Sequence, residues 1–391
     1  MKIVQINTTC GAGSTGKICV AVSDRLTQSG IENYILYASG NSEHPAGIKY
    51  MTAAEVKIQA LKSRIFGNYG FQSRQATKRL LAELDRIDPK IVHLHNLHGH
   101  NVHLGMLLSY LKAKKTRVFW TFHDCWAFTG YCPHYTMAGC GKWQTGCINC
   151  PQKHCYSWFF DRSESLFRKK KQLMEGLDLT IITPSQWLAD QIKQSFLREY
   201  PVKVINNGID LSVFFPRESN FRQKYNIESK IVVLGVAFGW GPRKGLDVFI
   251  ELAKCLDDRF QIVLVGTNDA VDKQLPDNIV SIHRTQNQVE LAEIYSAADI
   301  FVNPTREENF PTTHIEALAC GTPVVSFNTG GCSEMLTDKC GAVVKKNDIV
   351  GLTNKIQEAC CGRVFSKEAC IACAKEFDQW VKFEEYVALY E

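Results

Sequence analysis

Residues 300–327, IFVNPTREENFPTTHIEALACGTPVVSF, join two short apolar runs through a loop and a helical segment. The runs Ile300–Val302 and Pro323–Phe327 contain β-branched residues, which are typical of buried strands. Thr312–Ala319 has helical spacing, and Pro311 is a residue favoured in the first turn of a helix. A strand, a helix and a second strand in this order predict a parallel sheet in an α/β fold.

The same alternation of apolar runs and helical patterns continues along the chain in two series. The first series runs from Met1–Asn7 to Leu179–Thr183, and the second begins at Ile231–Val236. We therefore expect two Rossmann-like domains, residues 1–204 and residues 205–391, that face each other across a ligand-binding cleft. The helical, aromatic C-terminal stretch is expected to pack back on the first domain.

The composition is that of a globular protein, with 45% hydrophobic and 22% charged residues, so disordered and fibrous classes are excluded. No apolar window reaches the length of a membrane span and no secretory signal is recognisable, so we expect a cytoplasmic protein. The net charge of +5 is unevenly divided, with +11 on residues 1–200 and −6 on residues 201–391. A basic first half predicts an anionic partner, which is a nucleic acid, a phosphorylated ligand or a membrane surface.

A glycine-rich loop, GAGSTGK, follows the first expected strand at residues 11–17. It nearly matches a P-loop, but Ile18 stands where that motif has the hydroxyl that ligates Mg²⁺, so an ATPase is the weaker interpretation. Glycines let the backbone approach a phosphate closely, and the N-terminus of the next helix favours negative charge. We expect the amides near Gly13 to contact a phosphate; the alternative is a plain tight turn.

Two cations, Arg243 and Lys244, stand between the expected strand Ile231–Val236 and the next helix. This position suits a diphosphate, because lysine supplies a point charge and arginine a planar fork of donors. The alternative is a solvated surface pair.

Two carboxylates eight residues apart, Glu308 and Glu316, flank the start of the expected helix Thr312–Ala319. Each can accept hydrogen bonds from a pair of hydroxyls on a sugar or a ribose, while the free N–H groups of the helix face a phosphate. The alternative is a helix cap with a surface glutamate, and the adjacent Glu307 could take the place of Glu308.

Together these motifs resemble the retaining glycosyltransferases of family 4, which have the GT-B fold. The resemblance is carried by E-N-F-P-x₄-E-A-L-A-C-G-T-P-V-V from Glu308, by P-R-K-G from Pro242 and by N-N-G-I-D from Asn206, and it covers nearly the whole chain. The first half, with H-L-H-N-L-H from His93 and T-F-H-D-C-W-A-F-T-G from Thr121, resembles the branch that includes colanic-acid-type and other surface-polysaccharide transferases.

The resemblance implies a role for each matching position. Glu308 would hold hydroxyls of the donor sugar, and Glu316 would hold the ribose of the nucleotide. Lys244 would neutralise the diphosphate, and His123 would contact the sugar near the anomeric centre. The other expected donor-binding residues are Gly13, Arg243, Asn309, Phe310, Thr312 and Thr313, and the expected acceptor-side residues are His95, His98 and Asp124.

Two positions depart from the family pattern. The family usually carries Gly-Arg about five residues before the lysine, and Phe238-Gly239 stands there in this chain. We expect Arg243 to supply the missing charge from a different position. The usual E-G-F is replaced by E-N-F, which is a milder change.

The resemblance implies transfer of a hexose from a UDP- or GDP-linked sugar to a growing surface polysaccharide or a lipid-linked oligosaccharide, with retention of anomeric configuration. No cofactor is expected in catalysis, and the lack of an Asp-x-Asp motif gives no support to a metal-dependent GT-A transferase. The alternative is a sugar-nucleotide epimerase of the same fold. A nucleic-acid partner is not expected, because the sequence offers no recognition helix or stacking motif.

Five histidines lie between His93 and His103, at the end of an expected strand. A metal site is conceivable, but no carboxylate is nearby in the sequence, so a polar lining of the acceptor side is the preferred interpretation.

Six of the 16 cysteines fall between Cys125 and Cys155. Four of them have the spacing C-x₇-C-x₆-C-x₂-C, which suits a tetrahedral zinc site that would pin a loop without its own core. The alternatives are free thiols, redox pairs, or a ligand set in which His134 or Cys155 replaces one thiol. The four expected ligands of this structural zinc are Cys132, Cys140, Cys147 and Cys150.

Aromatic residues stand beside cations in Trp158–Phe160 and Phe167–Lys171. This pattern suits docking at an anionic membrane surface or binding of a lipid-diphosphate acceptor. The alternative is an ordinary helix with a solvated basic face. With the basic first half, the pattern leads us to expect a peripheral protein at the inner face of the cytoplasmic membrane.

Overall fold

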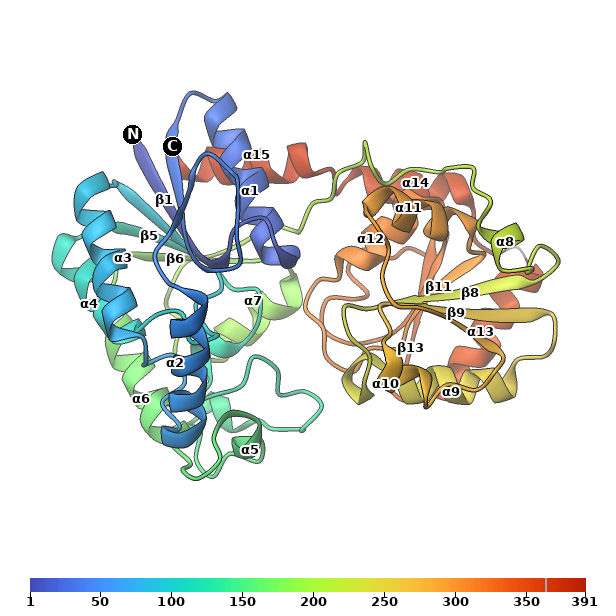
Figure 1. The fold of residues 1–391 in the computed structure, drawn as a ribbon, viewed down its shortest axis with the longest axis horizontal. Helices are drawn as coiled ribbons and strands as arrows, with labels where there is room; N and C mark the ends of the chain where they lie inside the picture. Colours follow the sequence, from blue (N-terminus) through green and yellow to red (C-terminus); the bar gives the residue numbers. More distant parts are fainter. Residues whose placement is uncertain (363) are drawn as a thin grey trace. The chain divides into compact units, whose positions relative to one another are not determined.

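The protein folds into two compact units in a computed structural model that describes residues 1–362 and 364–391 (Figure 1). Unit 1 comprises Met1–Asn206 and Lys382–Glu391, and unit 2 comprises Asn207–Val381. The boundary lies two residues beyond the one expected from the sequence. Residues 382–391, which we expected in the second domain, belong to unit 1. No helix among the described residues combines the length and hydropathy needed to cross a bilayer.

Unit 1 is built on a seven-stranded sheet in which every pairing is parallel. The strand order is β3-β2-β1-β4-β5-β6-β7, so the order reverses direction between β1 and β4, where open α/β sheets bind ligands. The strands are β1 (Lys2–Thr9), β2 (Glu32–Ser39), β3 (Gly47–Lys49), β4 (Ile91–Leu94), β5 (Arg117–Thr121), β6 (Leu179–Thr183) and β7 (Val202–Val204).

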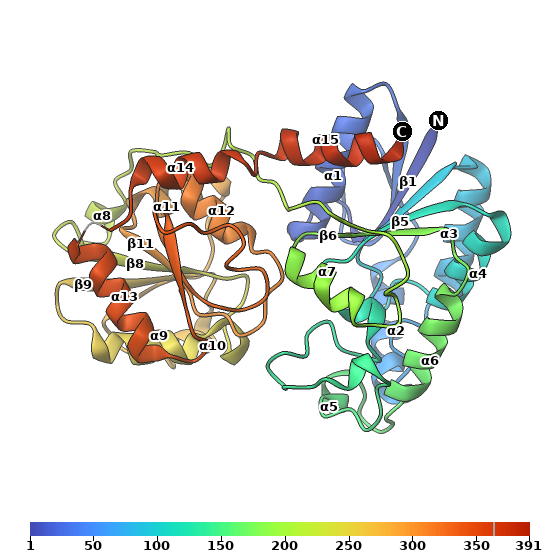
Figure 2. The same cartoon turned by 180° about the vertical axis from the view of Figure 1, so that it is seen from behind.

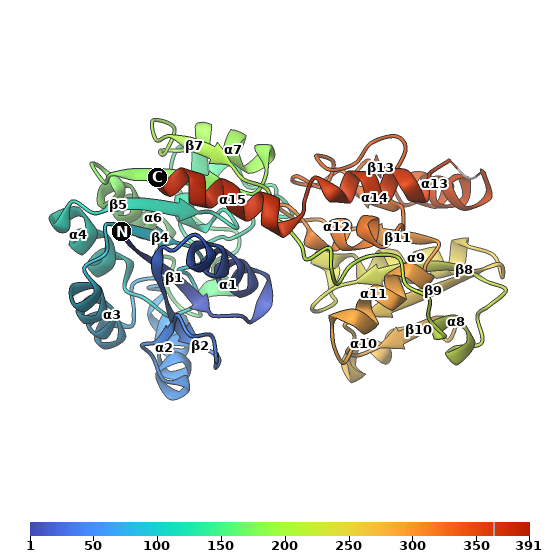
Figure 3. The same ribbon diagram turned by 90° about the horizontal axis from the view of Figure 1, so that it is seen from above.

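Helices cover both faces of this sheet, and its central strands are mainly apolar on both sides. On one face α1 and α15 lie side by side (Figures 2 and 3). There Phe383 and Tyr390 pack with Val22 of α1 and Phe119 of β5, so the C-terminal helix returns to the first domain as expected. The helices of unit 1 are α1 (Gly13–Gln28), α2 (Ala53–Phe66), α3 (Arg74–Ile87), α4 (Leu104–Lys114), α5 (Lys153–Tyr156), α6 (Ser163–Met174), α7 (Gln186–Lys193) and α15 (Gln379–Tyr390), which begins in unit 2.

Unit 2 has a six-stranded parallel sheet in the order β10-β9-β8-β11-β12-β13. Residues from α11, α12 and α14 form the core on one face, and residues from α9, α10 and α13 form it on the other (Figure 1). The strands are β8 (Ile231–Val236), β9 (Phe260–Val265), β10 (Ile279–Ile282), β11 (Ile300–Asn303), β12 (Val324–Phe327) and β13 (Gly341–Val344). The helices are α8 (Phe221–Lys224), α9 (Leu246–Cys255), α10 (Asp269–Asp272), α11 (Gln288–Ala297), α12 (Thr312–Ala319), α13 (Ile349–Gly362) and α14 (Lys367–Lys375).

The stretch at residues 300–327 forms β11, α12 and β12, and β11 pairs in parallel with both β12 and β8. The α/β prediction is therefore confirmed. Parallel neighbours bring their carboxyl ends to one edge of the sheet. The loops after β8 and β11, which carry Lys244 and Glu308, consequently emerge side by side.

Candidate active site

Lys244 and Glu308 form an ion pair in unit 2. Nζ of Lys244 lies 2.6 Å from Oε2 of Glu308, and the two side chains are only 23% and 19% exposed. Charges in direct contact at a partly buried site are poorly screened by solvent and salt. The pair therefore presents one cation and one carboxylate at the carboxyl edge of the sheet, close enough to contact adjacent groups of one ligand.

Hydrogen bonds between the two loops fix this pair. The backbone N–H of Arg306 and the hydroxyl of Thr305 both donate to the carbonyl of Arg243, at 2.8 and 3.3 Å. The guanidinium of Arg306 reaches the carboxylate of Asp247 at 2.7 Å and also donates to a backbone carbonyl of the β8–α9 loop. Arg306 could not be identified from the sequence, because its partners Pro242, Asp247 and Asn347 are 41 to 64 residues away in the chain.

Two glycines allow the loops to approach closely. Gly245 has φ +77°, and a Cβ there would lie 2.5 Å from the carbonyl oxygen of Pro304. Gly330 has φ +57°, and a Cβ there would lie 2.0 Å from the carbonyl oxygen of Glu308. Side chains are excluded at both positions, since real Cβ contacts are not this short and positive φ disfavours other residues. The signal for Gly330 in the sequence was the Gly-Gly pair that follows β12.

Helix α12 exposes only the residues expected to bind a donor. Thr312, Thr313 and Glu316 are partly exposed, and the other five residues of the helix are buried. The N-cap residue of α12, Pro311, provides no side-chain cap, so it leaves amides of the first turn available to a ligand. Oε2 of Glu316 accepts a hydrogen bond of 3.1 Å from the hydroxyl of Tyr295, which orients that carboxylate.

The remaining candidates of this region divide into buried and exposed residues. Glu307 is buried, with 6% of its surface exposed, whereas Glu308 forms the ion pair with Lys244. Glu308 is therefore the better candidate of the two for binding a ligand. Asn309 and Phe310 are 4% exposed, and the ring of Phe310 lies in the core against Phe377. Phe310 thus anchors the loop, and its ring does not form part of an open surface. Arg243 is exposed beside the pair.

Unit 1 carries the glycine-rich loop directly after β1. Gly11 and Gly13 have φ +80° and +67°, and the N–H of Gly11 donates to the carbonyl of Gly16 at 3.0 Å. A Cβ on Gly16 would lie 2.6 Å from Oγ1 of Thr9, so the turn packs tightly on the strand end. Helix α1 begins at Gly13 after Ala12, which offers no capping side chain. The loop therefore leaves helix N-terminal amides for an anion, as the sequence indicated.

A chain of hydrogen bonds sets the tautomers of two histidines beside this loop. The side-chain N–H of Gln5 donates to the carbonyl of Cys19, so Oε1 of Gln5 accepts from Nε2 of His95 at 3.1 Å. Nδ1 of His95 is then the acceptor for Nε2–H of His123 at 3.3 Å. Burial lowers the pKa of His123 to about 4, so its ring is neutral at pH 7. The hydrogen bond to His95 fixes the orientation of the ring.

His98 and Asp124 form a second pair nearby, with Nε2 of His98 2.6 Å from Oδ2 of Asp124. Burial alone would raise the pKa of Asp124. The charge and the hydrogen bond of His98 outweigh that effect, and the pKa falls below its usual value, to about 2. The other oxygen of Asp124 accepts from the N–H of Trp126 at 2.8 Å, which ties the pair to the cysteine-rich loop.

The five histidines do not act as one metal site. His93 is fully buried between Tyr390 and Thr121, and His103 caps the start of α4. Among the described residues, they form no group of three ligand atoms within 4.8 Å of one another. His95 is 2% exposed, so it contacts and positions His123 and does not line an open surface, whereas His98, His123 and Asp124 are partly exposed.

Comparisons with known proteins agree with the fold and the motifs. The family model for glycosyltransferase family 4 matches residues 16–213, about half of the chain, and the model for glycosyl transferases group 1 matches residues 228–361. The chain is 25% identical to the putative colanic acid biosynthesis glycosyl transferase WcaC of Escherichia coli K12, over the full length of both chains.

Two further proteins are similar to this chain, one in sequence and one in fold. An N,N'-diacetylbacillosaminyl-diphospho-undecaprenol alpha-1,3-N-acetylgalactosaminyltransferase of Campylobacter jejuni is 29% identical over 52% of this chain and 57% of its own. The structure of Anabaena HepE in complex with UDP-glucose superposes with a TM-score of 0.71 at 14% identity, covering 100% of this chain and 99% of that one. These matches give no support to a sugar-nucleotide epimerase. The protein is a glycosyltransferase of GT-B fold, and it belongs to glycosyltransferase family 4.

Proposed function

We propose that this glycosyltransferase moves a hexose from a nucleoside diphosphate sugar to a lipid-linked or growing surface-polysaccharide acceptor, with retention of configuration. The observation that carries the proposal is the Lys244–Glu308 pair beside the uncapped α12 and Glu316. The cation and the helix amides suit a diphosphate, and the two carboxylates suit the hydroxyls of a sugar and of a ribose. The UDP-glucose bound by HepE and the undecaprenol-linked acceptor in the name of the Campylobacter enzyme support the donor and acceptor classes.

In this proposal the residues of the chain act mainly through electrostatics. The diphosphate leaving group gains negative charge as its bond to the sugar breaks, and Lys244, Arg243 and the amides of α12 stabilise that charge. Glu308 orients the sugar hydroxyls once Lys244 has turned to the phosphate. Nδ1 of neutral His123, whose Nε2–H donates to His95, accepts a hydrogen bond from a sugar hydroxyl without adding charge. The leaving phosphate takes the acceptor proton on the same face, so the product keeps the donor's anomeric configuration, which NMR of the product checks.

Binding of a panel of UDP- and GDP-sugars tests the donor. We expect one nucleotide series to raise the melting temperature by about 5 °C or more at about 100 times its Kd, because a ligand that binds only the folded state stabilises it. Glu316→Gln should reduce the shift strongly, since it removes the carboxylate assigned to the ribose. Glu358→Gln, an exposed glutamate of α13 on the opposite face of the sheet, is the matched control and should leave the shift unchanged. A panel without any shift would overturn the proposal.

We further propose that unit 1 docks on an anionic membrane surface. An aromatic patch is 47–66% exposed, and it consists of Phe66, Trp158, Phe159 and Phe160. Its parts are held together by two hydrogen bonds: the N–H of Trp158 donates to the carbonyl of Arg64, and Nε of Arg162 donates to the carbonyl of Phe66, both at 2.7 Å. Exposed aromatic rings beside cations suit the headgroup region of a bilayer.

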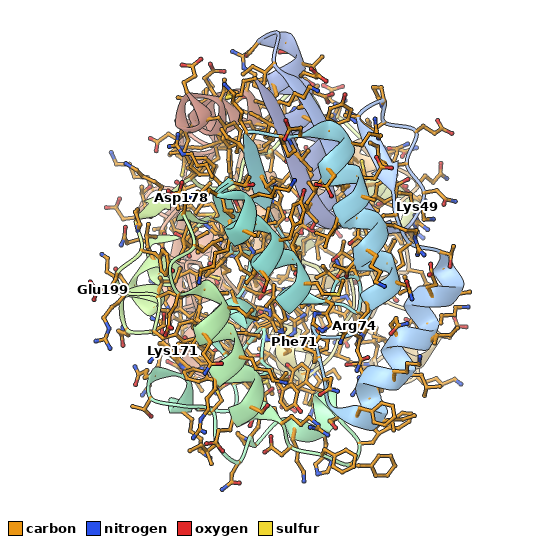
Figure 4. The ribbon with its side chains drawn as sticks, turned by 90° about the vertical axis from the view of Figure 1, so that its left-hand side faces the viewer. Lys49, Phe71, Arg74, Lys171, Asp178 and Glu199 are labelled. Atoms are coloured by element: carbon orange, nitrogen blue, oxygen red, sulfur yellow. The ribbon has the colours of Figure 1, made fainter. Side chains whose placement is uncertain are left out.

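Cations surround the patch and extend over unit 1. Arg162 lies over the ring of Phe160, and Lys57 and Lys62 are exposed on α2. Figure 4 shows Arg74, at the start of α3, and Lys171, in α6, on one side of the unit. The stretch Phe167–Lys171 contributes less than its sequence suggested, because Phe167 and Lys170 are buried.

Sedimentation with vesicles tests the docking surface. We expect binding to vesicles with about one third phosphatidylglycerol and much weaker binding to pure phosphatidylcholine, since each nearby cation contributes about 1 kcal/mol at an anionic surface. Phe159→Ser should weaken binding several-fold. Phe215→Ser is the matched control, because Phe215 is 41% exposed beside Arg217 in unit 2. Equal binding to both lipids, or equal losses in both variants, would contradict the proposal.

A further inference from the structure

The segment between β5 and α6, residues 122–162, is long and has little regular structure. It contains two three-residue 3-10 turns, Trp126–Phe128 and Lys142–Gln144, and the four-residue α5. Loops longer than about 12–15 residues without secondary structure are uncommon inside a compact domain. Yet Tyr135 and Trp143 of this segment are 6% and 3% exposed, so the loop is packed and needs a further source of order.

The four thiols with metal-ligand spacing converge in this segment. They line one cavity of about 20 Å³, together with Tyr135 and Trp143. That volume accommodates a single water or ion. Neither His134 nor Cys155 lines the cavity, so the two alternative ligands that the sequence left open lie outside it. The four lining thiols are Cys132, Cys140, Cys147 and Cys150.

Hydrogen-bond donors point at the sulfur atoms. The N–H of Gly130 donates to Sγ of Cys147 at 3.1 Å, and the amide of Gln152 donates to Sγ of Cys132 at 3.6 Å. A Cβ on Gly130 would lie 3.0 Å from the Cβ of Cys147, so glycine permits this approach. The buried indole N–H of Trp143 has no acceptor among the described residues. Donors of this kind commonly stabilise metal-bound thiolates, whose charge a neutral thiol lacks.

The charges around the cavity have the sign that a four-thiolate zinc site requires. Zinc with four thiolates carries a net charge of −2. The fully buried Lys170 lies near Cys147, and its ammonium donates to the carbonyls of Trp126 and Thr129 at 2.7 and 3.0 Å. Nζ of Lys170 lies 3.7 Å from the ring centroid of Trp126 and forms no ion pair within 4 Å among the described residues, so its buried charge is only partly compensated. A negative metal cluster supplies the counter-charge.

We propose that Cys132, Cys140, Cys147 and Cys150 bind one structural zinc ion. The four thiols bind as thiolates and release their protons to solvent, and no oxidant or reductant takes part. Among the described residues no three of these sulfur atoms lie within 4.8 Å of one another, so binding of the ion requires side-chain rotations that bring the thiols together. The ion fixes the loop next to Asp124 and Trp126, and thereby supports the acceptor side of unit 1.

Metal content and cobalt spectroscopy of the full-length protein test the site. Protein purified under reducing conditions without chelator should contain about one zinc ion per chain, as measured by inductively coupled plasma mass spectrometry. Replacement of zinc by Co²⁺ should give thiolate-to-cobalt charge-transfer bands and the strong visible bands of a tetrahedral site. These measurements need no variant and no activity, so their outcome is independent of the proposed function.

Cysteine variants identify the ligands. Cys147→Ser and Cys150→Ser should each lower the zinc content several-fold, and Cys150→His should retain it, because histidine also binds zinc tetrahedrally. Cys373→Ser is the matched control and should keep the zinc, since Cys373 lies in unit 2, where its thiol donates to the carbonyl of Met335 at 2.9 Å. Reduced wild-type protein without zinc and without cobalt charge-transfer bands would overturn the proposal. So would a Cys132–Cys150 disulfide in the purified protein, or full zinc retention in the Cys147→Ser/Cys150→Ser variant.

Discussion

Lys244→Met is expected to lower the kcat/KM of sugar transfer by a factor of about 10² to 10³, while the protein remains folded. The ammonium of Lys244 is assigned to the diphosphate, and a fixed charge at a partly buried leaving group is worth this much in the transition state. Methionine keeps the length and the apolar stem of lysine and removes only the charge. The rate of nucleoside diphosphate release with the donor identified by thermal shift measures the effect.

The chain offers a matched control for this prediction. Lys254 pairs with Glu251 at 2.7 Å on α9, but these side chains are 63% and 48% exposed. Lys254→Met removes the same charge from an ion pair in the same unit and should leave transfer within about twofold of wild type, because exposed pairs contribute little. Equal activity of Lys244→Met and Lys254→Met would remove Lys244 from the site.

Glu308→Gln is expected to lower kcat by a factor of about 10² or more, with a smaller change in KM. The carboxylate accepts hydrogen bonds from sugar hydroxyls and holds them as positive charge develops on the sugar ring, so its contribution is largest in the transition state. The amide of glutamine retains one acceptor and lacks the negative charge. Steady-state kinetics with varied donor concentration separates kcat from KM.

Two further measurements distinguish a catalytic loss from misfolding. Glu251→Gln, the partner of the control lysine, should leave both constants unchanged. The melting temperatures of Glu308→Gln and Lys244→Met should fall by only a few degrees, since the pair is partly exposed and each remaining partner can reach water. Normal turnover by Glu308→Gln, or a loss confined to KM, would falsify the assignment of this carboxylate to the transition state.

Much of the fold was predictable because its strands carry their signal locally. Two strands and one helix have the bounds expected from their apolar patterns: β6 (Leu179–Thr183), β8 (Ile231–Val236) and α12 (Thr312–Ala319). These segments are buried on both sides of a parallel sheet or lie along one apolar helix face, so every residue contributes to the pattern. The edge strand β3 was not predicted, because Gly47–Lys49 is short and partly exposed and has no periodicity to recognise.

The candidate site was predictable as a set of residues but not as an arrangement. The sequence identified Lys244, Glu308 and Glu316 from their positions at strand and helix ends. It gave no sign that Arg306 ties the two loops together or that Gly330 admits the carbonyl of Glu308. Those contacts join residues that are distant in the chain, so only the packed sheet brings them together.

The sequence alone determined the α/β architecture, the tandem domains and the chemical types of the candidate groups, because these follow from periodicity and from motifs within a few dozen residues. The tertiary structure decided which groups meet. It paired Lys244 with Glu308, buried His95 behind His123, returned Tyr390 to His93 and gathered four thiols around one cavity. Such contacts depend on how strands and loops pack across the fold, and residues far apart along a chain leave no local pattern that records their meeting.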